Sequence, residues 1–538
     1  MQAPARKRGR LWTWVVAGCG VLLVLIIGAV IAGYLLAPRI QDVARGRVEN
    51  ILQERFHSSV EFSNFYVDLY PRIRLTITDL VLRHKGRTDI PPLIQIQKVT
   101  IDSALLELWG PRHRVQRVQI VGLQIHMPPR NANGPPLIHG TSTDLAKKYP
   151  IFIEEMDADN ALVVLLRKPQ DADKPPNQFE IHQLVMRDFS FDQPANFHAL
   201  LTNPKPRGEI HCDGQFGPWR SDEPSQTPVR AHYTFEHADL GTLKGISGIL
   251  SSVGKFSGPL DYLNVEGTTD TPDFAVRTSG HPVPLHTDFT AIVDGTNGNT
   301  ILTNVTAKFL HTTIVTRGEV VDVYKNVKGR TISLEAASNN AQLEDLLNLA
   351  VKSDQPVMTG SARLHTKILI PERDEDLIDR MQLNGQFALA DLHFTSDQVQ
   401  DKVDSLSRKG QGEPNDFDIA DMMSGLDGKF TMKKGTLDFT NLDFAVEGAS
   451  ITLGGTYDVD DGQMDFRGKL RLQAKLSQTM TGWKSVVLKP FDHFFKGKDG
   501  GTEIPIRIAG TREHLHYGAD FHDKDKAELE NSSKASTQ

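Results

Sequence analysis

Hydrophobic and polar residues alternate along most of this chain with a period of two, which is typical of strands that have one buried face. The alternation begins near Val60, with Phe65, Val67 and Leu69, and after a phase slip it resumes at Leu80. Pro and Gly residues divide it into short runs, as expected of turns between strands. The pattern predicts a mainly β protein whose antiparallel strands follow one another as hairpins.

An uncharged apolar run, LWTWVVAGCGVLLVLIIGAVIAGYLLA, covers residues 11–37. About 20 apolar residues suffice for a helix to span the hydrocarbon core of a bilayer, whereas the apolar part of a cleaved signal peptide has about 7 to 15 residues. We therefore predict a retained transmembrane helix over 11–37. Because basic residues are concentrated in residues 1–10, these are predicted to be a cytoplasmic basic tail, and the bulk of the chain to lie on the other side of the membrane.

Apolar residues recur at helical spacing in a few short segments. The first, over residues 40–52, predicts an amphipathic helix that packs on the next strands, with the bilayer surface as the alternative site. A second helix is predicted over residues 343–350, and residues 397–421 are predicted as a polar helix or insertion.

A late amphipathic helix is predicted near the C-terminus. Met480, Trp483 and Val487 lie at helical spacing, Phe491 follows, and lysines flank them. Such a helix either covers the apolar end of a sheet or lies on an anionic membrane surface. Because the strand Ile504–Ile508 follows at once, we favour the capping helix over the membrane-proximal one.

An internal repeat joins two distant parts of the chain. Residues 303–318, TNVTAKFLHTTIVTRG, align without gaps on residues 440–455, TNLDFAVEGASITLGG. The repeated unit is strand, turn, strand, turn. Repetition of this kind favours an elongated sheet that grows by adding hairpins, with compact domains as the alternative.

Composition narrows the class of protein. The chain has 538 residues and a net charge of -7, with 60 basic and 67 acidic residues, and no long basic stripe follows the N-terminal tail. We therefore expect no nucleic-acid partner. The two cysteines, Cys19 and Cys212, are not expected to pair, which removes disulfide scaffolds and multi-cysteine zinc sites from consideration.

Clusters of reactive side chains are few. DGTNGNT, residues 294–300, contains oxygen ligands that calcium prefers, but the string is also typical of a turn, which we favour. His514 and His516 would share a strand face without a third metal ligand. Glu209, His211, Cys212 and Asp213 alternate across a strand and cannot converge on one substrate. We predict neither an enzyme, nor a cofactor, nor a metal site.

What the sequence predicts is a long sheet with one apolar face. Such a face is covered by another layer, as in a filled β-sandwich, or closes into an apolar groove. The helices are too few to cover it, so a curled sheet with a groove that holds acyl chains is one solution. The candidate lining residues are Leu437, Phe439, Leu442, Phe444, Val446, Ile451 and Leu453.

Two stretches resemble the AsmA-like family, whose larger relatives include TamB. The first comprises the anchor, the amphipathic helix and VEFSNFYVDLYPRIRLTITDLVLRH with the strands after it. The second is GLDGKFTMKKGTLDFTNLDFAVEGASITLGGTYDVDDGQMDFRGKLRL followed by IPIRIAGT. The resemblance assigns an N-terminal module to residues 38–130 and a C-terminal module to 425–523. The extended β region between them, residues 131–424, is similar only in style, and the last residues, 524–538, are predicted from their own composition as a disordered tail.

The resemblance implies a function as well as an architecture. It implies a single-pass anchor in the bacterial inner membrane, a periplasmic apolar groove, and a part in phospholipid handling or transport during outer-membrane biogenesis. The alternative is an envelope scaffold that carries no lipid and influences outer-membrane protein assembly through protein partners.

Overall fold

The structure is a computed structural model of the whole chain. It describes residues 41–520 except for 44, 47, 51, 54–57, 69–72, 85–90, 93, 104–112, 128–150, 166–176, 191, 219, 221–225, 278, 296–297, 323–329, 353–354, 373–374, 417, 419–420, 481–488, 490–491, 493–494, 498–500 and 512–513.

The predicted membrane anchor, residues 11–37, lies outside the described residues, as do the predicted tails 1–10 and 524–538. Among the helices that the structure does describe, none is long and apolar enough to cross a membrane. The anchor therefore stays a prediction.

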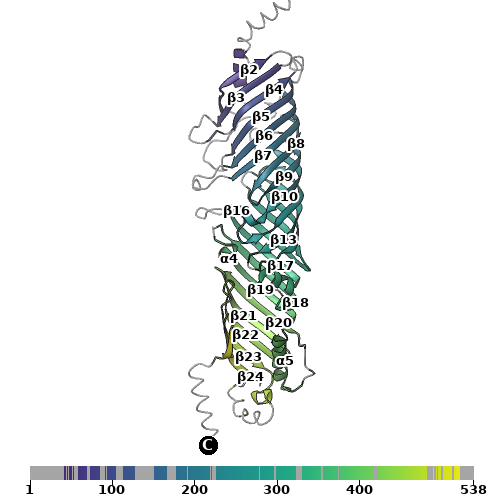
Figure 1. Cartoon of the computed structure of the whole chain (residues 1–538), viewed down its shortest axis with the longest axis vertical. Helices are drawn as coiled ribbons and strands as arrows, with labels where there is room; N and C mark the ends of the chain where they lie inside the picture. The colour runs from purple at the N-terminus through teal and green to yellow at the C-terminus, as the bar shows by residue number, and fades with distance from the viewer. Residues whose placement is uncertain are drawn as a thin grey trace, which may run out of the picture. The chain divides into compact units, whose positions relative to one another are not determined.

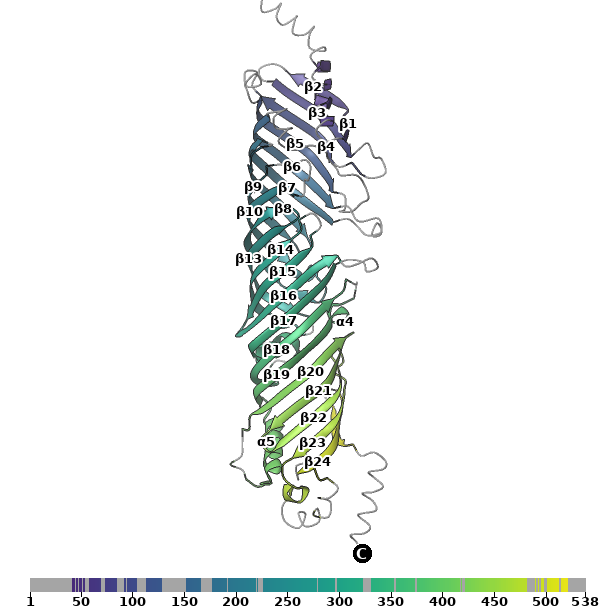
Figure 2. The same cartoon turned by 180° about the vertical axis from the view of Figure 1, so that it is seen from behind.

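The described chain is mainly β, as predicted, with 25 strands and a few short helices (Figures 1 and 2). It divides into two compact units: unit 1 comprises residues 1–199 and 215–227, and unit 2 comprises residues 200–214 and 228–538. The division falls within β8 (Ala195–Pro204) and β9 (Arg207–Phe216).

Unit 1 is a sheet with an apolar core on one face. Its other strands are β1 (Ser58–Glu61), β2 (Asn64–Asp68), β3 (Ile73–His84), β4 (Ile94–Ser103), β5 (His113–Met127), β6 (Ile151–Leu165) and β7 (Asn177–Ser190). Buried Phe65, Ile77, Val99 and Val118 belong to the core. The phase slip before Leu80 corresponds to Asp79, which has a positive φ.

The predicted helix after the anchor is present over the described residues between 41 and 53. Val48 and Leu52 pack against the core of unit 1, and the Arg45 guanidinium lies 4.8 Å from the centre of the Phe62 ring. The helix thus packs on the following strands, which was the favoured alternative.

One pair of strands in unit 1 departs from the predicted antiparallel arrangement. β5 and β6 pair in parallel, from His113 opposite Ile151 to Met127 opposite Leu165. Period-two alternation gives the face of each side chain but not the direction of the strand. A parallel pair needs a long crossover connection, and residues 128–150 are long enough to supply it.

The sheet of unit 2 is open, curled and antiparallel. Its strands are β10 (Pro228–Asp239), β11 (Ile246–Ser247), β12 (Ile249–Pro259), β13 (Leu263–Val276), β14 (Val283–Val293), β15 (Thr300–Phe309), β16 (Thr312–Asp322), β17 (Arg330–Gln342), β18 (Met358–Ile370), β19 (Gln382–Phe394), β20 (Ser424–Lys433), β21 (Thr436–Val446), β22 (Ala449–Asp458), β23 (Met464–Leu472), β24 (Thr502–Gly510) and β25 (Leu515–Ala519). From β12 to β25 each strand pairs with the next one in the chain.

Short helices follow some of these strands. They are η4 (Leu240–Thr242), α3 (Leu343–Ala350), α4 (Leu377–Arg380), α5 (Asp397–Gln411) and η5 (Leu476–Thr479). The helix predicted over 343–350 is confirmed as α3. The polar segment 397–421 contains a helix, α5, which ends at Gly412 in the left-handed conformation that favours glycine.

The repeat corresponds to the hairpins β15–β16 and β21–β22. In each hairpin the repeated Thr-Asn pair forms a β-bulge, because Leu302 pairs with Gly318 and Val305 with Thr316, while Phe439 pairs with Gly455 and Leu442 with Leu453. The bulge brings residues three apart onto the same face of the sheet and increases the local twist.

Candidate functional site

The apolar face of unit 2 can be traced from the cross-strand register, because directly opposed residues share a face. On β21 and β22, Leu442 lies opposite Leu453 and Phe444 lies opposite Ile451. All the predicted lining residues share this face: Leu437, Phe439, Leu442, Phe444, Val446, Ile451 and Leu453. The same face continues through Leu470 and Phe466 on β23 to Ile504 and Ile508 on β24.

The burial of these lining residues is incomplete. Val446 and Leu453 are 8% and 9% exposed, whereas Leu437, Phe439, Leu442, Phe444 and Ile451 are half-buried. A second sheet or layer of helices packed over the face would bury apolar side chains of this size more completely.

Four phenylalanine rings gather on this face. Phe387 lies 6.1 Å from Phe430 and 6.4 Å from Phe439, between ring centres, and Phe439 lies 5.8 Å from Phe466. Gly455 on β22 pairs with both Phe439 and Phe466 and has no side chain to separate the two rings. Tilted and edge-to-face pairs at these distances are favourable.

Three of these rings were not among the predicted lining residues: Phe387, Phe430 and Phe466. A sequence signal exists for two of them, because Gly385-Gln386-Phe387 and Gly428-Lys429-Phe430 repeat a G-x-F pattern. The two copies pair with each other, so that Gly385 faces Phe430 and Phe387 faces Gly428. An aromatic ring opposite a glycine covers the exposed backbone.

The opposite face of the same strands is charged and water-facing. Arg507 on β24 forms a two-pronged ion pair with Asp465 on β23, at 2.8 and 3.0 Å. Glu503 accepts from Lys469 and from Arg471. These hydrogen bonds lower the pKa of Asp465 and of Glu503. The two faces of this sheet thus differ in polarity, one charged and the other apolar.

Helix α5 covers one end of the apolar face. Its Val403 packs with Val446, Ala449 and Leu472. The buried Asp404 carboxylate, 5% exposed, accepts from the backbone N–H groups of Asp421 and Met422 at 3.1 and 3.0 Å and from Gln400 Nε2 at 3.0 Å. These hydrogen bonds fix the helix to the chain that enters β20.

The predicted late helix is described only in part. η5 ends at Thr479, and Met480 follows with 43% exposure. Trp483, Val487 and Phe491 lie outside the described residues. Whether this segment caps the sheet or contacts a membrane therefore stays a prediction.

Cys212 points inward on β9 and is buried, whereas Glu209 and Asp213 are exposed on the other face. Burial, with a contribution from Asp213, raises the pKa of the Cys212 thiol to about 11. A thiol of this kind is a poor nucleophile at neutral pH. The structure separates these residues as the alternation predicted.

The two remaining clusters show no converging ligands. In DGTNGNT, the N–H of Asp294 donates to Asn299 O and that of Gly298 to Asp294 O, which is a turn; Asn297 lies outside the described residues. His514, directly before β25, and His516, within it, are both exposed. The described residues contain no group of three or more His, Cys, Asp or Glu side chains able to hold a metal ion.

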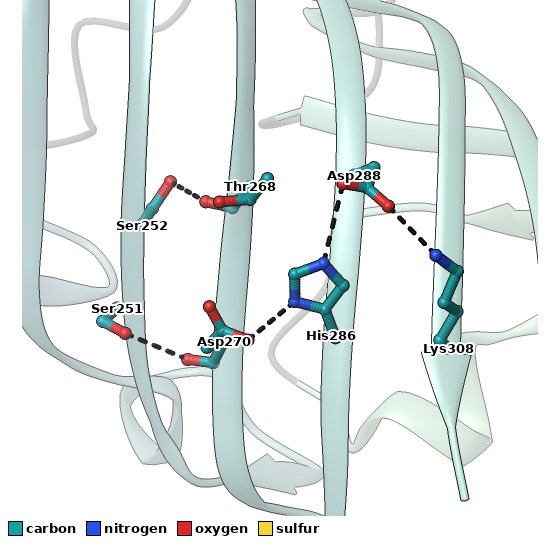
Figure 3. Close-up of polar contacts among 7 residues, drawn as sticks. All are labelled: Ser251, Ser252, Thr268, Asp270, His286, Asp288 and Lys308. Carbon is teal, nitrogen blue, oxygen red and sulfur yellow. Dashed lines mark hydrogen bonds and ion pairs between the residues drawn. The ribbon is translucent and has the colours of Figure 1, made fainter.

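A polar ladder crosses strands β12 to β15 on the charged face (Figure 3). His286 Nδ1 lies 2.7 Å from Asp270 Oδ1, its Nε2 lies 3.6 Å from Asp288 Oδ1, and Asp288 also pairs with Lys308 at 3.5 Å. The hydrogen bond with Asp270 is the main cause that raises the pKa of His286, and the charge of Asp288 adds to it.

We expect Asp270→Asn to lower the pKa of His286 more than Asp288→Asn does, because Asp270 makes the shorter contact. Since folding raises this pKa, the ladder stabilises the protein below the unfolded-state pKa, and the stabilisation is lost as the pH rises through the folded-state value. Titration of the His286 ring by NMR in both variants measures the two shifts. Equal decreases of the His286 pKa in the two variants would contradict the prediction that Asp270 is the main cause of its raised pKa.

Comparison with protein-family models, with curated proteins and with solved structures finds no match to this chain. The resemblance to the AsmA-like family therefore remains a prediction from the residues that carry it.

Proposed function

We propose that this protein handles phospholipid and holds acyl chains against the apolar face of unit 2. The observation that carries the proposal is the half-buried set Leu437, Phe439, Leu442, Phe444 and Ile451, on a face whose opposite side is charged. Water next to these side chains is unfavourable, and an acyl chain would displace it.

The energetic scale fits such a ligand. Burial of an acyl CH2 group contributes about 0.8 kcal/mol, so a chain of about 16 carbons gains on the order of 10 kcal/mol when it leaves water. The rings of Phe387, Phe430, Phe439 and Phe466 offer a continuous apolar surface across several strands. A phospholipid headgroup would remain in water.

The proposed location is a bacterial envelope. In this proposal residues 11–37 anchor the chain in the inner membrane, the bulk of the chain is periplasmic, and the transported lipid serves outer-membrane biogenesis. The sequence pattern of the anchor and the resemblance of both ends of the chain to the AsmA-like family support it.

Site-specific photo-crosslinking in the full-length protein tests the proposal. A benzoyl-phenylalanine in place of Leu442 should form an adduct with radiolabelled phospholipid, whereas the same probe in place of the neighbouring Asp443, on the opposite face, should not. Absence of a phospholipid adduct at Leu442, with the protein folded and in the membrane, rules the proposal out.

A second candidate function is an envelope scaffold that recruits a protein by strand addition. The observation that favours it is β25, whose five residues are all exposed and which pairs with β24 as its described neighbour. An exposed edge strand can accept a further strand from a partner. A scaffold of this kind tolerates polar residues on the apolar face, whereas a lipid carrier does not.

A further inference from the structure

Two segments of unit 2 that are far apart in the sheet meet beside α4. Gly245, which follows η4, packs so tightly on α4 that a Cβ on it would lie 2.5 Å from Leu377 Cβ. Arg277, directly after β13, forms an ion pair with Asp376, directly before α4. The backbone links the first pair to the second, because Arg277 N donates to Gly245 O at 3.0 Å.

The contact shows that opposite edges of the sheet come together here. β13 and β18 are separated by β14, β15, β16 and β17, so at about 4.8 Å per strand they would lie roughly 24 Å apart in a flat sheet. Moreover, β13 ends at one edge and β18, with α4 after it, ends at the other, because the strands alternate in direction. Direct contact requires strands β13 to β18 of this open sheet to curl until α4 bridges its two edges, which gives a ring closed by the contacts of α4 and not by strand pairing (α4 is labelled in Figures 1 and 2).

Some buried polar atoms in this part of the sheet lack hydrogen-bond partners. Among the described residues, three buried side-chain polar atoms lack a hydrogen-bond partner: Thr271 Oγ1, His281 Nδ1 and Arg380 Nε. Thr271 lies in β13, His281 follows β13, and Arg380 lies in α4. Unpaired buried polar atoms cost free energy, and they occur in or next to both of the elements that meet here, β13 and α4.

The ion pair that joins the two edges is also weak. The Arg277 side chain is 70% exposed and that of Asp376 is 26% exposed. Exposed ion pairs contribute little to stability and are screened by salt. Gly245 has a φ of +99°, a conformation that glycine adopts without strain, so the tight approach to Leu377 depends on it.

We propose that α4 is a strap that gates the passage of phospholipid through the ring of strands β13 to β18. The inference rests on the proposed function. A lipid whose chains lie on the apolar face and whose headgroup lies in water cannot pass a closed ring, because the headgroup would have to cross the strap. The strap therefore opens for each lipid that moves between the apolar surface of β12 and that of β21.

A covalent lock tests the strap. Arg277→Cys and Asp376→Cys, combined with Cys19→Ser, place two thiols at the strap, while Cys212 stays buried. The full-length protein is reconstituted in vesicles of phosphatidylethanolamine and phosphatidylglycerol that contain radiolabelled lipid. A short bis-maleimide locks the strap, and N-ethylmaleimide, which modifies the same thiols singly, is the matched control.

Photoreactive probes on each side of the ring report the lipid. They replace Phe256, half-buried on β12, or Leu442 on β21. With the lock we expect the lipid adduct to persist at one probe and to be lost at the other, whereas the control protein gives both adducts. Equal labelling at both probes in locked and control protein overturns the strap as a gate.

Two other results would have a different meaning from equal labelling at both probes. Failure of the two thiols to react with one bis-maleimide overturns the closed ring itself. Absence of lipid adducts at both probes in the control protein overturns the proposed function instead.

Discussion

Phospholipid bound to this protein should fall at least about tenfold when Leu442 and Ile451 are both replaced by asparagine, since each buried amide without a partner costs about 1 to 3 kcal/mol. The two side chains are half-buried on neighbouring strands of the apolar face. Asparagine has the same number of side-chain heavy atoms as leucine, branched at the same carbon, so polarity changes more than shape. The measurement is the yield of lipid adduct with a photoreactive residue in place of Phe439.

The matched control changes the same two strands on the opposite face. Asp443 lies directly opposite Thr452, and replacing both by asparagine adds the same side chains one position away from Leu442 and Ile451. This variant should keep its lipid. If both double variants are folded by circular dichroism and retain equal lipid, the apolar face of β21 and β22 does not hold acyl chains.

Replacing Asp404 by alanine should lower the free energy of unfolding by about 3 kcal/mol, because it removes a carboxylate that accepts several hydrogen bonds in a buried site. The N–H groups of Asp421 and Met422 lose their acceptor. Helix α5 should then detach from the end of the apolar face. Urea denaturation measures the stability, and binding of an apolar dye measures the newly exposed surface.

Asp401 provides the control for this substitution, because it is an exposed aspartate in the same helix. Asp401→Ala should change the free energy of unfolding by less than about 0.5 kcal/mol. Similar losses for Asp401→Ala and Asp404→Ala would contradict the prediction that the buried hydrogen bonds of Asp404 hold α5 in place.

The sequence predicted the parts of the fold that depend on local pattern. Alternation identified the strands and the face of each side chain, so the lining residues Leu442, Phe444, Ile451 and Leu453 do share one face. Helical spacing identified α3. The Thr-Asn repeat marked equivalent hairpins, although only the register shows that each contains a bulge directly after a residue that pairs with glycine.

Features that depend on distant contacts could not be predicted from such patterns. The parallel pairing of β5 with β6 leaves no trace in the alternation. The contact of Gly245 with Leu377 joins residues more than a hundred positions apart, and neither segment has an unusual composition. The aromatic cluster depends on which strands are neighbours, so Phe466 could be placed beside Phe439 only through Gly455.

The spacing of the repeated hairpins constrains how a chain of this kind can lengthen. From β15 to β21 the repeat advances by six strands, an even number, so the second hairpin runs in the same direction as the first. Duplication of a block with an odd number of strands would reverse the direction and move the inserted helices, such as α3, to the opposite edge. Viable duplications should therefore occur in whole hairpins, which makes the length of the sheet a quantity that evolution changes in steps of two strands.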